Sequence, residues 1–88
     1  MSDTIDRLRI LGAQLDAART EASVLEAEWR RLFKAWLPYI YKVGLIADSY
    51  RLPTAYAQTA AIDSRERAAI IKADYTELAL QLAAEMCR

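Results

Sequence analysis

The 88-residue sequence contains no histidine, a single cysteine, two glycines and two prolines. Without histidine there is no imidazole to ligate a metal, to serve as the base of a serine triad, or to titrate near neutral pH. The one cysteine, Cys87, provides neither an internal disulfide nor a paired-cysteine zinc site. A glycine-rich phosphate loop and a GxSxG motif are also missing. We therefore expect no metal, no cofactor and no catalysis.

The scarcity of glycine and proline also limits the fold. A chain with 55% hydrophobic residues is too apolar to be disordered, and so few turn-forming residues do not suit a many-stranded β fold. The length suits one small domain, and such a domain buries only about 60% of the surface of its unfolded chain. The sequence thus predicts a single all-helical domain over residues 1–88, stabilised in part by a partner or by self-association.

Targeting signals are not evident in the sequence. The first residues, MSDTID, are acidic where a signal peptide is basic, and the longest stretch without a charged residue, Leu52 to Ile62, is too short to span a membrane. We expect a soluble, cytoplasmic protein in which Cys87 is a free thiol in a reducing compartment.

Charge is distributed unevenly along a chain whose formal net charge is zero. Residues 29–51 contain five basic residues and one acidic residue, whereas residues 1–28 contain three basic and six acidic residues. A basic centre between acidic ends can contact an acidic partner. It does not amount to the strongly basic patch of a nucleic-acid-binding protein, so we do not expect nucleic-acid binding.

Apolar residues recur at alternating spacings of three and four in the first part of the chain. The pattern holds for four heptads without interruption, at Leu8, Leu11, Leu15, Ala18, Ala22, Leu25, Trp29, Leu32 and Trp36. It predicts a long helix over about residues 3–37 that ends or kinks at Pro38. A further apolar row at Ile10, Ala17 and Val24 indicates that more than one neighbour covers this helix.

Two shorter helices are predicted in the middle of the chain. The apolar phase continues past Pro38 to Val43, Ile46 and Tyr50, which predicts a helix over residues 39–50 with these three side chains in the core. A break at Pro53, followed by Thr54 as a helix cap, predicts a short helix over residues 54–62.

A second long helix is predicted over residues 64–87. Asp63 and Glu66 have the spacing of a capping box. Apolar residues then recur at spacings of three and four, at Ala68, Ile71, Tyr75, Leu78, Leu82 and Met86. The fold class is therefore an all-α, small antiparallel helical bundle, in which the two long helices form a hairpin with one or two short helices between them.

Aromatic and basic side chains gather in the centre of the sequence. Tyrosine and arginine are enriched at protein-binding hot spots. We predict a docking surface for a larger protein partner at Arg30, Phe33, Lys34, Tyr39, Tyr41, Lys42 and Tyr56. The alternative is that the tyrosine rings lie at the margin of the core with only their hydroxyls in water.

The favoured function is a non-catalytic protein-protein interaction module. We expect a small accessory protein that docks on a larger protein to inhibit, adapt or scaffold it, as compact phage or mobile-element proteins do. Homodimerisation is a further expectation, because the predicted helices carry more apolar surface than one short chain can hide.

A helix-turn-helix DNA-binding regulator is the alternative. In TAYAQTAAIDSRERAAII, residues 55–62 and 65 onward can form two short helices, with Ser64, Arg65 and Arg67 near the start of the recognition helix. Against it, the turn has no glycine and the acids Asp63 and Glu66 would face DNA phosphates.

In length and in its long first helix the chain also resembles small all-helical mutases of the chorismate mutase type. The resemblance implies an enzyme acting by electrostatics, with Arg7 in IDRLRIL, Lys42 and Arg51 in a basic pocket. The arginine spacing and the later acid and glutamine of that family are not recognisable, so the chain is not assigned to it.

Overall fold

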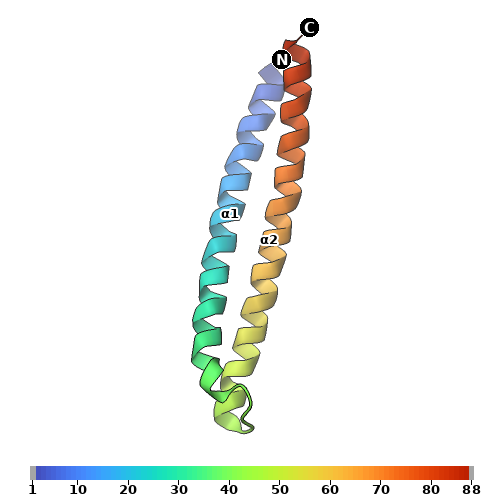
Figure 1. Cartoon of the computed structure of the whole chain (residues 1–88). Helices are drawn as coiled ribbons and strands as arrows, with labels where there is room; N and C mark the ends of the chain where they lie inside the picture. Colours follow the sequence, from blue (N-terminus) through green and yellow to red (C-terminus); the bar gives the residue numbers. More distant parts are fainter. Residues whose placement is uncertain (1, 88) are drawn as a thin grey trace.

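The computed structural model describes Ser2–Cys87 as two long helices packed side by side in opposite directions (Figure 1). α1 spans Ser2–Trp36, the short 3-10 helix η1 spans Leu37–Tyr39, and α2 spans Leu45–Met86. The hairpin is a rod with extents of 66 × 16 × 14 Å. Its two termini lie at one end and the loop at the other (Figure 1). The predicted all-α hairpin of two long helices is confirmed.

The end of the first helix lies where Pro38 predicts it. α1 ends at Trp36, and Pro38 follows in the first turn of η1, where its missing amide N–H costs no helical hydrogen bond. The amide of Ile40 then donates to the carbonyl of Leu37 at 3.3 Å, which closes the 3-10 turn.

The predicted helix over residues 39–50 is wrong. η1 ends at Tyr39, and the chain reverses through residues 40–44 before α2 begins. The reversal uses Gly44, whose φ of 138° and ψ of 178° lie in a region that essentially only glycine adopts. Val43 and Ile46, expected in the core, are 99% and 63% exposed.

The separate short helix over residues 54–62 is also wrong, because α2 continues through Pro53 and Asp63 without a break. Pro53 cannot donate to the carbonyl of Ser49, which costs the helix a hydrogen bond. The helix nevertheless remains in register with α1, since Ala47 and Thr54 are buried on either side of the proline. The turn on which a helix-turn-helix depends is therefore absent from residues 55–65.

The core is a seam between α1 and α2. Every position of the predicted heptad pattern in α1 is buried or half-buried. α2 contributes its own row at spacings of three and four, at Ala47, Tyr50, Thr54, Ala57, Ala61, Ser64, Ala68, Ile71, Tyr75, Leu78 and Leu82. The last part of this row matches the prediction, except that Met86 is exposed.

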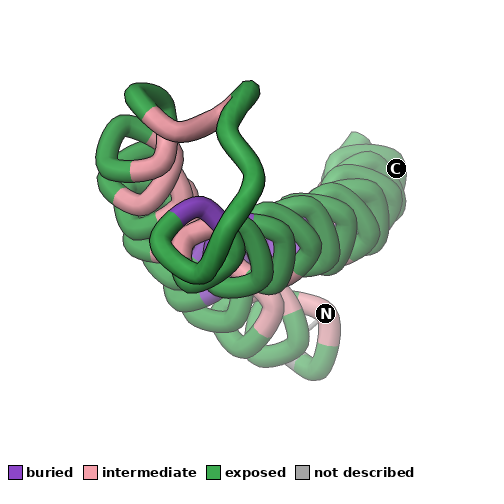
Figure 2. The backbone as a smooth tube through the Cα atoms, turned by 90° about the horizontal axis from the view of Figure 1, so that it is seen from below, coloured by how far each residue is buried: buried purple, intermediate pink, exposed green. Residues whose placement is uncertain are grey.

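Small side chains dominate the middle of the seam. Ala18 and Ala22 on α1, and Ala61, Ser64 and Ala68 on α2, are buried, and Ala22 is 0% exposed. Figure 2 views the rod from the loop end and colours most of the backbone as exposed, with buried residues only where the helices face each other. The buried core is thus one residue layer thick, and the two helices approach closely along it.

The apolar row at Ile10, Ala17 and Val24 has no neighbour in the hairpin. Its residues lie on the side of α1 that faces away from α2 and are exposed. The expectation that a second element of the chain covers this row is wrong, because residues 39–62 contribute to the loop and to α2 instead of forming a crossing pair of helices.

We predict that Ala22→Leu destabilises the hairpin. Leucine is a favourable residue at this heptad position in many coiled coils, but here Ala22 is fully buried between the helices, and overpacking typically costs about 1–3 kcal/mol. Urea unfolding followed by circular dichroism measures the change. The matched control is Ala17→Leu on the exposed side of α1, which should stay within about 0.5 kcal/mol of the wild type. Equal stability of the two variants would contradict a tightly packed seam.

Replacing each of the two glycines with alanine should change the free energy of unfolding in opposite directions. Gly44→Ala places a side chain at φ 138° and should cost about 1–3 kcal/mol, although nothing lies within 4 Å of the added Cβ. Gly12→Ala adds a Cβ 3.4 Å from Cε2 of Tyr75, an ordinary contact, and should stabilise α1 by about 0.5–1 kcal/mol. Thermal unfolding of both variants tests the pair, and a shift of the same sign in both would refute this account of the loop.

Candidate interaction surface at the loop end

Two aromatic rings hold the loop against α2. Tyr39, the last residue of η1, stacks on Tyr50 in the second turn of α2, with ring centroids 5.6 Å apart and planes inclined by 8°. The ammonium nitrogen of Lys42 lies 5.8 Å from the centroid of the Tyr39 ring, within cation–π range. The structure thus brings together two of the predicted site residues, Tyr39 and Lys42. Their contact is supported by Tyr50, a residue that the sequence pattern predicts in the core.

Phe33 belongs to an aromatic row along α1. Its ring centroid lies 6.0 Å from that of Trp29 and 6.2 Å from that of Trp36. The three residues are four and three positions apart and therefore share one side of the helix. Phe33 is half-buried at the edge of the seam.

Large apolar side chains at the tip of the loop are almost fully exposed. Tyr41 is 96% exposed, Val43 is 99% exposed and Leu45 is 89% exposed. Together with Ile46 they form what we call the loop-tip patch, residues 41–46. Sequence reasoning selected Tyr41 and Lys42 from this segment but missed the three aliphatic residues, because it placed them on a helix. Gly44 was the signal that the helix could not continue.

The other predicted site residues lie behind the loop. Arg30 and Lys34 are exposed on the last turns of α1 and share a shallow surface hollow with Ala27 and Arg31. Tyr56 is exposed on α2, about two turns beyond Tyr50. The seven residues therefore extend over the loop half of the rod instead of forming one compact patch.

Basic side chains near the loop differ in how they are neutralised. Arg51 pairs with Asp48 at 3.0 Å, and Arg31 lies 3.8 Å from Glu28. Within Ser2–Cys87, Arg30, Lys34 and Lys42 have no carboxylate within 4.0 Å. The loop end therefore presents uncompensated positive charge beside exposed apolar surface.

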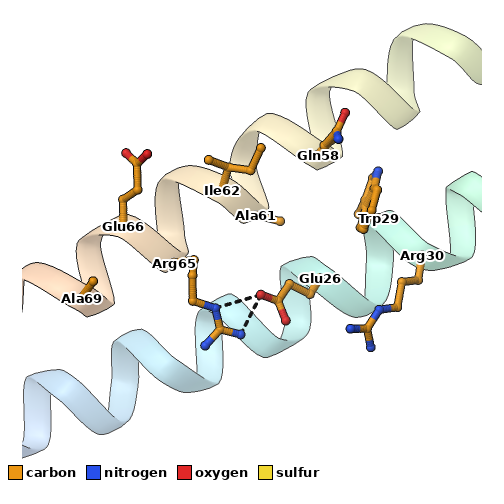
Figure 3. A pocket seen from close by; sticks show the side chains of 9 residues that line it. All are labelled: Glu26, Trp29, Arg30, Gln58, Ala61, Ile62, Arg65, Glu66 and Ala69. Atoms are coloured by element: carbon orange, nitrogen blue, oxygen red, sulfur yellow. Dashed lines mark hydrogen bonds and ion pairs between the residues drawn. The ribbon is translucent and has the colours of Figure 1, made fainter. Parts of the chain in front are cut away.

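A second hollow, of about 450 Å³, lies beside the seam in the middle of the rod (Figure 3). Trp29 of α1 and Ile62 of α2 line it, and an ion pair between the helices closes one end. The Nε and Nη2 atoms of Arg65 both donate to Oε1 of Glu26, at 2.8 and 2.6 Å. On the opposite flank of the seam Arg67 lies 3.8 Å from Glu21. Arg65 and Arg67, the DNA-contacting residues of the helix-turn-helix alternative, thus pair with α1.

The residues required for a mutase-type basic pocket are not brought together. Arg7 lies on the second turn of α1, near the end of the rod that holds both termini, whereas Lys42 lies in the loop at the other end (Figure 1). The rod is 66 Å long. Arg7 therefore cannot share a substrate pocket with Lys42 in this hairpin.

The described part of the chain has neither a candidate metal site nor a candidate membrane span. Between Ser2 and Cys87, no three acidic or sulfur-bearing side chains gather closely enough to hold a metal ion. Neither helix in that range contains a segment that is both long and apolar enough to cross a bilayer.

Comparisons with known proteins give no family for this chain. No family model, no curated protein and no solved structure matches it. The function is therefore inferred from the geometry and exposure of the chain's own residues.

We predict that the two tyrosines at the loop differ in their effect on stability. Tyr50→Ala should lower the free energy of unfolding by about 1–3 kcal/mol, because it removes a stacked pair worth about 0.5–1.5 kcal/mol together with part of the ring's buried area. Tyr41→Ala should change stability by less than about 0.5 kcal/mol, because its ring is already in water. Urea unfolding of both variants measures this difference, and a larger loss in Tyr41→Ala would mean that Tyr41 packs in the fold.

Proposed function

We propose that the chain is a non-catalytic protein-protein interaction module that docks on a larger protein through the loop-tip patch. The observation that carries the proposal is the exposure of Tyr41, Val43 and Leu45 at 96%, 99% and 89% on one short segment. Full burial of side chains of this size stabilises a complex by about 1.5–3 kcal/mol each. Three such side chains on one tip supply the apolar centre of a small interface.

The charge around the patch defines the chemistry of the partner. Lys42 lies within the patch and is positioned over the ring of Tyr39, while Lys34 lies on the last turn of α1. An interface with an apolar centre and a basic rim suits a partner surface with an apolar pocket surrounded by carboxylates. Association with such a surface should be slower and weaker at high salt, because the rim charges are exposed and are screened.

The shape of the molecule supports an adapter or inhibitor more than a catalyst. The hairpin carries the patch at one end of a rod 66 Å long, far from the end at which both termini lie. The ring stack of Tyr39 and Tyr50 fixes the loop, so part of the entropy cost of ordering it is met before binding. Through such a tip the chain would block, adapt or scaffold the surface of its partner.

The test uses the double variant Tyr41→Ala with Lys42→Glu. It should keep the circular dichroism and melting temperature of the wild type and bind the partner at least about tenfold more weakly, because it removes an aromatic anchor and reverses a rim charge. The partner is first identified by co-purification from the native host, and its affinity for each variant is then measured by titration.

The matched control is Arg9→Glu with Ile10→Ala. It makes the same kind of change in two adjacent exposed residues of α1, close to the opposite end of the rod. Wild-type affinity in the control and reduced affinity in the loop variant support docking through the tip. Reduced affinity in the control alone, or equal loss in both, would place the interface elsewhere on the rod.

A further inference from the structure

A second apolar row runs along the outer side of α2, away from the seam. It occupies positions 52, 55, 59, 62, 66, 69, 73, 76, 80 and 83, again at alternating spacings of three and four, and every one of these residues is exposed. The large residues are Leu52, Ile62 and Leu80, Glu66 is the one charged residue, and the rest are alanine or threonine. We call these ten positions the outer row.

The hydroxyl groups of both threonines in the outer row already donate hydrogen bonds within α2. The hydroxyl of Thr59 donates to the carbonyl of Ala55 at 3.1 Å, and that of Thr76 donates to the carbonyl of Lys72 at 2.8 Å. Both side chains can therefore be covered without leaving a buried donor unpaired. Apart from Glu66, the outer row can be covered by another molecule without burying an unpaired polar group.

The solvent-accessible area of the hairpin exceeds that of a compact monomer. It is 6682 Å², whereas a compact folded monomer of 10.0 kDa exposes about 5,200 Å². The radius of gyration is 19.5 Å, against about 12 Å for a compact domain of this length. The excess of roughly 1,500 Å² falls within the range of about 1,000–2,500 Å² that each subunit of an obligate homodimer buries.

We propose that a second copy of this chain covers the outer row, with its own α2 packed antiparallel against the first. The twofold axis passes between Arg67 and Ala68, so that positions whose numbers add to 135 face each other. This arrangement places each large side chain opposite an alanine of the second copy. The pairs are Leu52 with Ala83, Leu80 with Ala55, and Ile62 with Ala73. Such alternation of large and small residues fills an interface evenly.

The single charge in the row selects the antiparallel direction. A parallel pair would bring Glu66 against Glu66 of the second copy, which is repulsive. In the antiparallel pair Glu66 faces Ala69 and comes near Lys72 of the second copy. Neither Glu66 nor Lys72 has an ion-pair partner within 4.0 Å among the described residues of its own chain, so each is free to pair across the interface.

The axis also lies near the middle of α2, which spans Leu45–Met86. Two rods joined there overlap over most of their length, and their loops point in opposite directions. The loop-tip patch is not part of the interface and remains free at each end. The dimer therefore stands on its own evidence, and docking of a larger protein at the loop neither requires it nor is excluded by it.

Cysteine cross-linking tests both the contact and its direction. In a Cys87→Ser background, Thr59→Cys and Thr76→Cys are prepared as separate single-cysteine chains. Two copies of Thr59 lie about 25 Å apart in the antiparallel dimer, at 1.5 Å per residue over 17 positions, whereas Thr59 lies opposite Thr76 of the second copy. Oxidation of either chain alone should give little disulfide dimer, and oxidation of the mixture should give the mixed dimer. Dimer from Thr59→Cys alone would show parallel pairing, and no mixed dimer would overturn the proposal.

Sedimentation of the full chain supplies the second measurement. The wild type should sediment as a dimer, and Leu80→Asp should raise the dimer dissociation constant at least 100-fold while keeping its helical circular dichroism. The control Val24→Asp, at a similarly exposed residue on the outer side of α1, should dimerise like the wild type. If Leu80→Asp unfolds the chain, the cross-linking experiment decides whether the antiparallel dimer forms. A monomeric wild type at several hundred micromolar, or dissociation by Val24→Asp alone, would refute an interface on α2.

Discussion

Among residues 3–87, the buried apolar side chains all lie where α1 faces α2. They are Leu15, Ala18, Ala22, Ala47, Ala61, Ala68 and Leu78, and five of the seven are alanine. A seam of small residues lets the helices approach closely but buries little area per residue, so its stability comes from length and unbroken register. The path of α2 through Pro53 fits that requirement, because an interruption there would separate Ala47 and Tyr50 from the rest of the seam.

The seam between α1 and α2 also determines which apolar side chains remain exposed. Two helices packed along single stripes cover each other on one side only, and each helix has a second, weaker apolar row on its far side. On α2 that row extends from Leu52 to Ala83 with one charge, and on α1 it includes Ile10, Ala17 and Val24. The loop adds the patch at residues 41–46, since a tip that only reverses the chain has nothing to fold back onto. Exposure of apolar surface is thus a direct consequence of a hairpin with no third layer, and this exposed surface supports both the docking proposal and the dimer proposal.

Particular elements show how far sequence reasoning reached. The heptads of α1 and the stop at Pro38 were predictable because helical periodicity and the missing amide of proline are local effects. The seven predicted site residues all lie in the loop half of the rod, and a cation–π contact joins two of them, Tyr39 and Lys42. The aliphatic residues of the tip were missed for one reason. The apolar spacing through Val43 and Ile46 is compatible with a helix. The chain departs from helical geometry at Gly44, which the spacing alone does not reveal.

Sequence alone determined the helical class, the stripe of α1, the absence of histidine chemistry and the uneven distribution of charge, because each follows from residue type and spacing. Only the tertiary structure decided that Pro53, unlike Pro38, does not end a helix. Both interrupt hydrogen bonding, but Pro38 precedes the reversal, whereas Pro53 lies within a stretch that α1 holds in register. It also decided that Arg65 pairs with Glu26 and that Arg7 and Lys42 lie at opposite ends of a rod. These relations depend on the register between segments far apart in the chain, and no local pattern encodes that register.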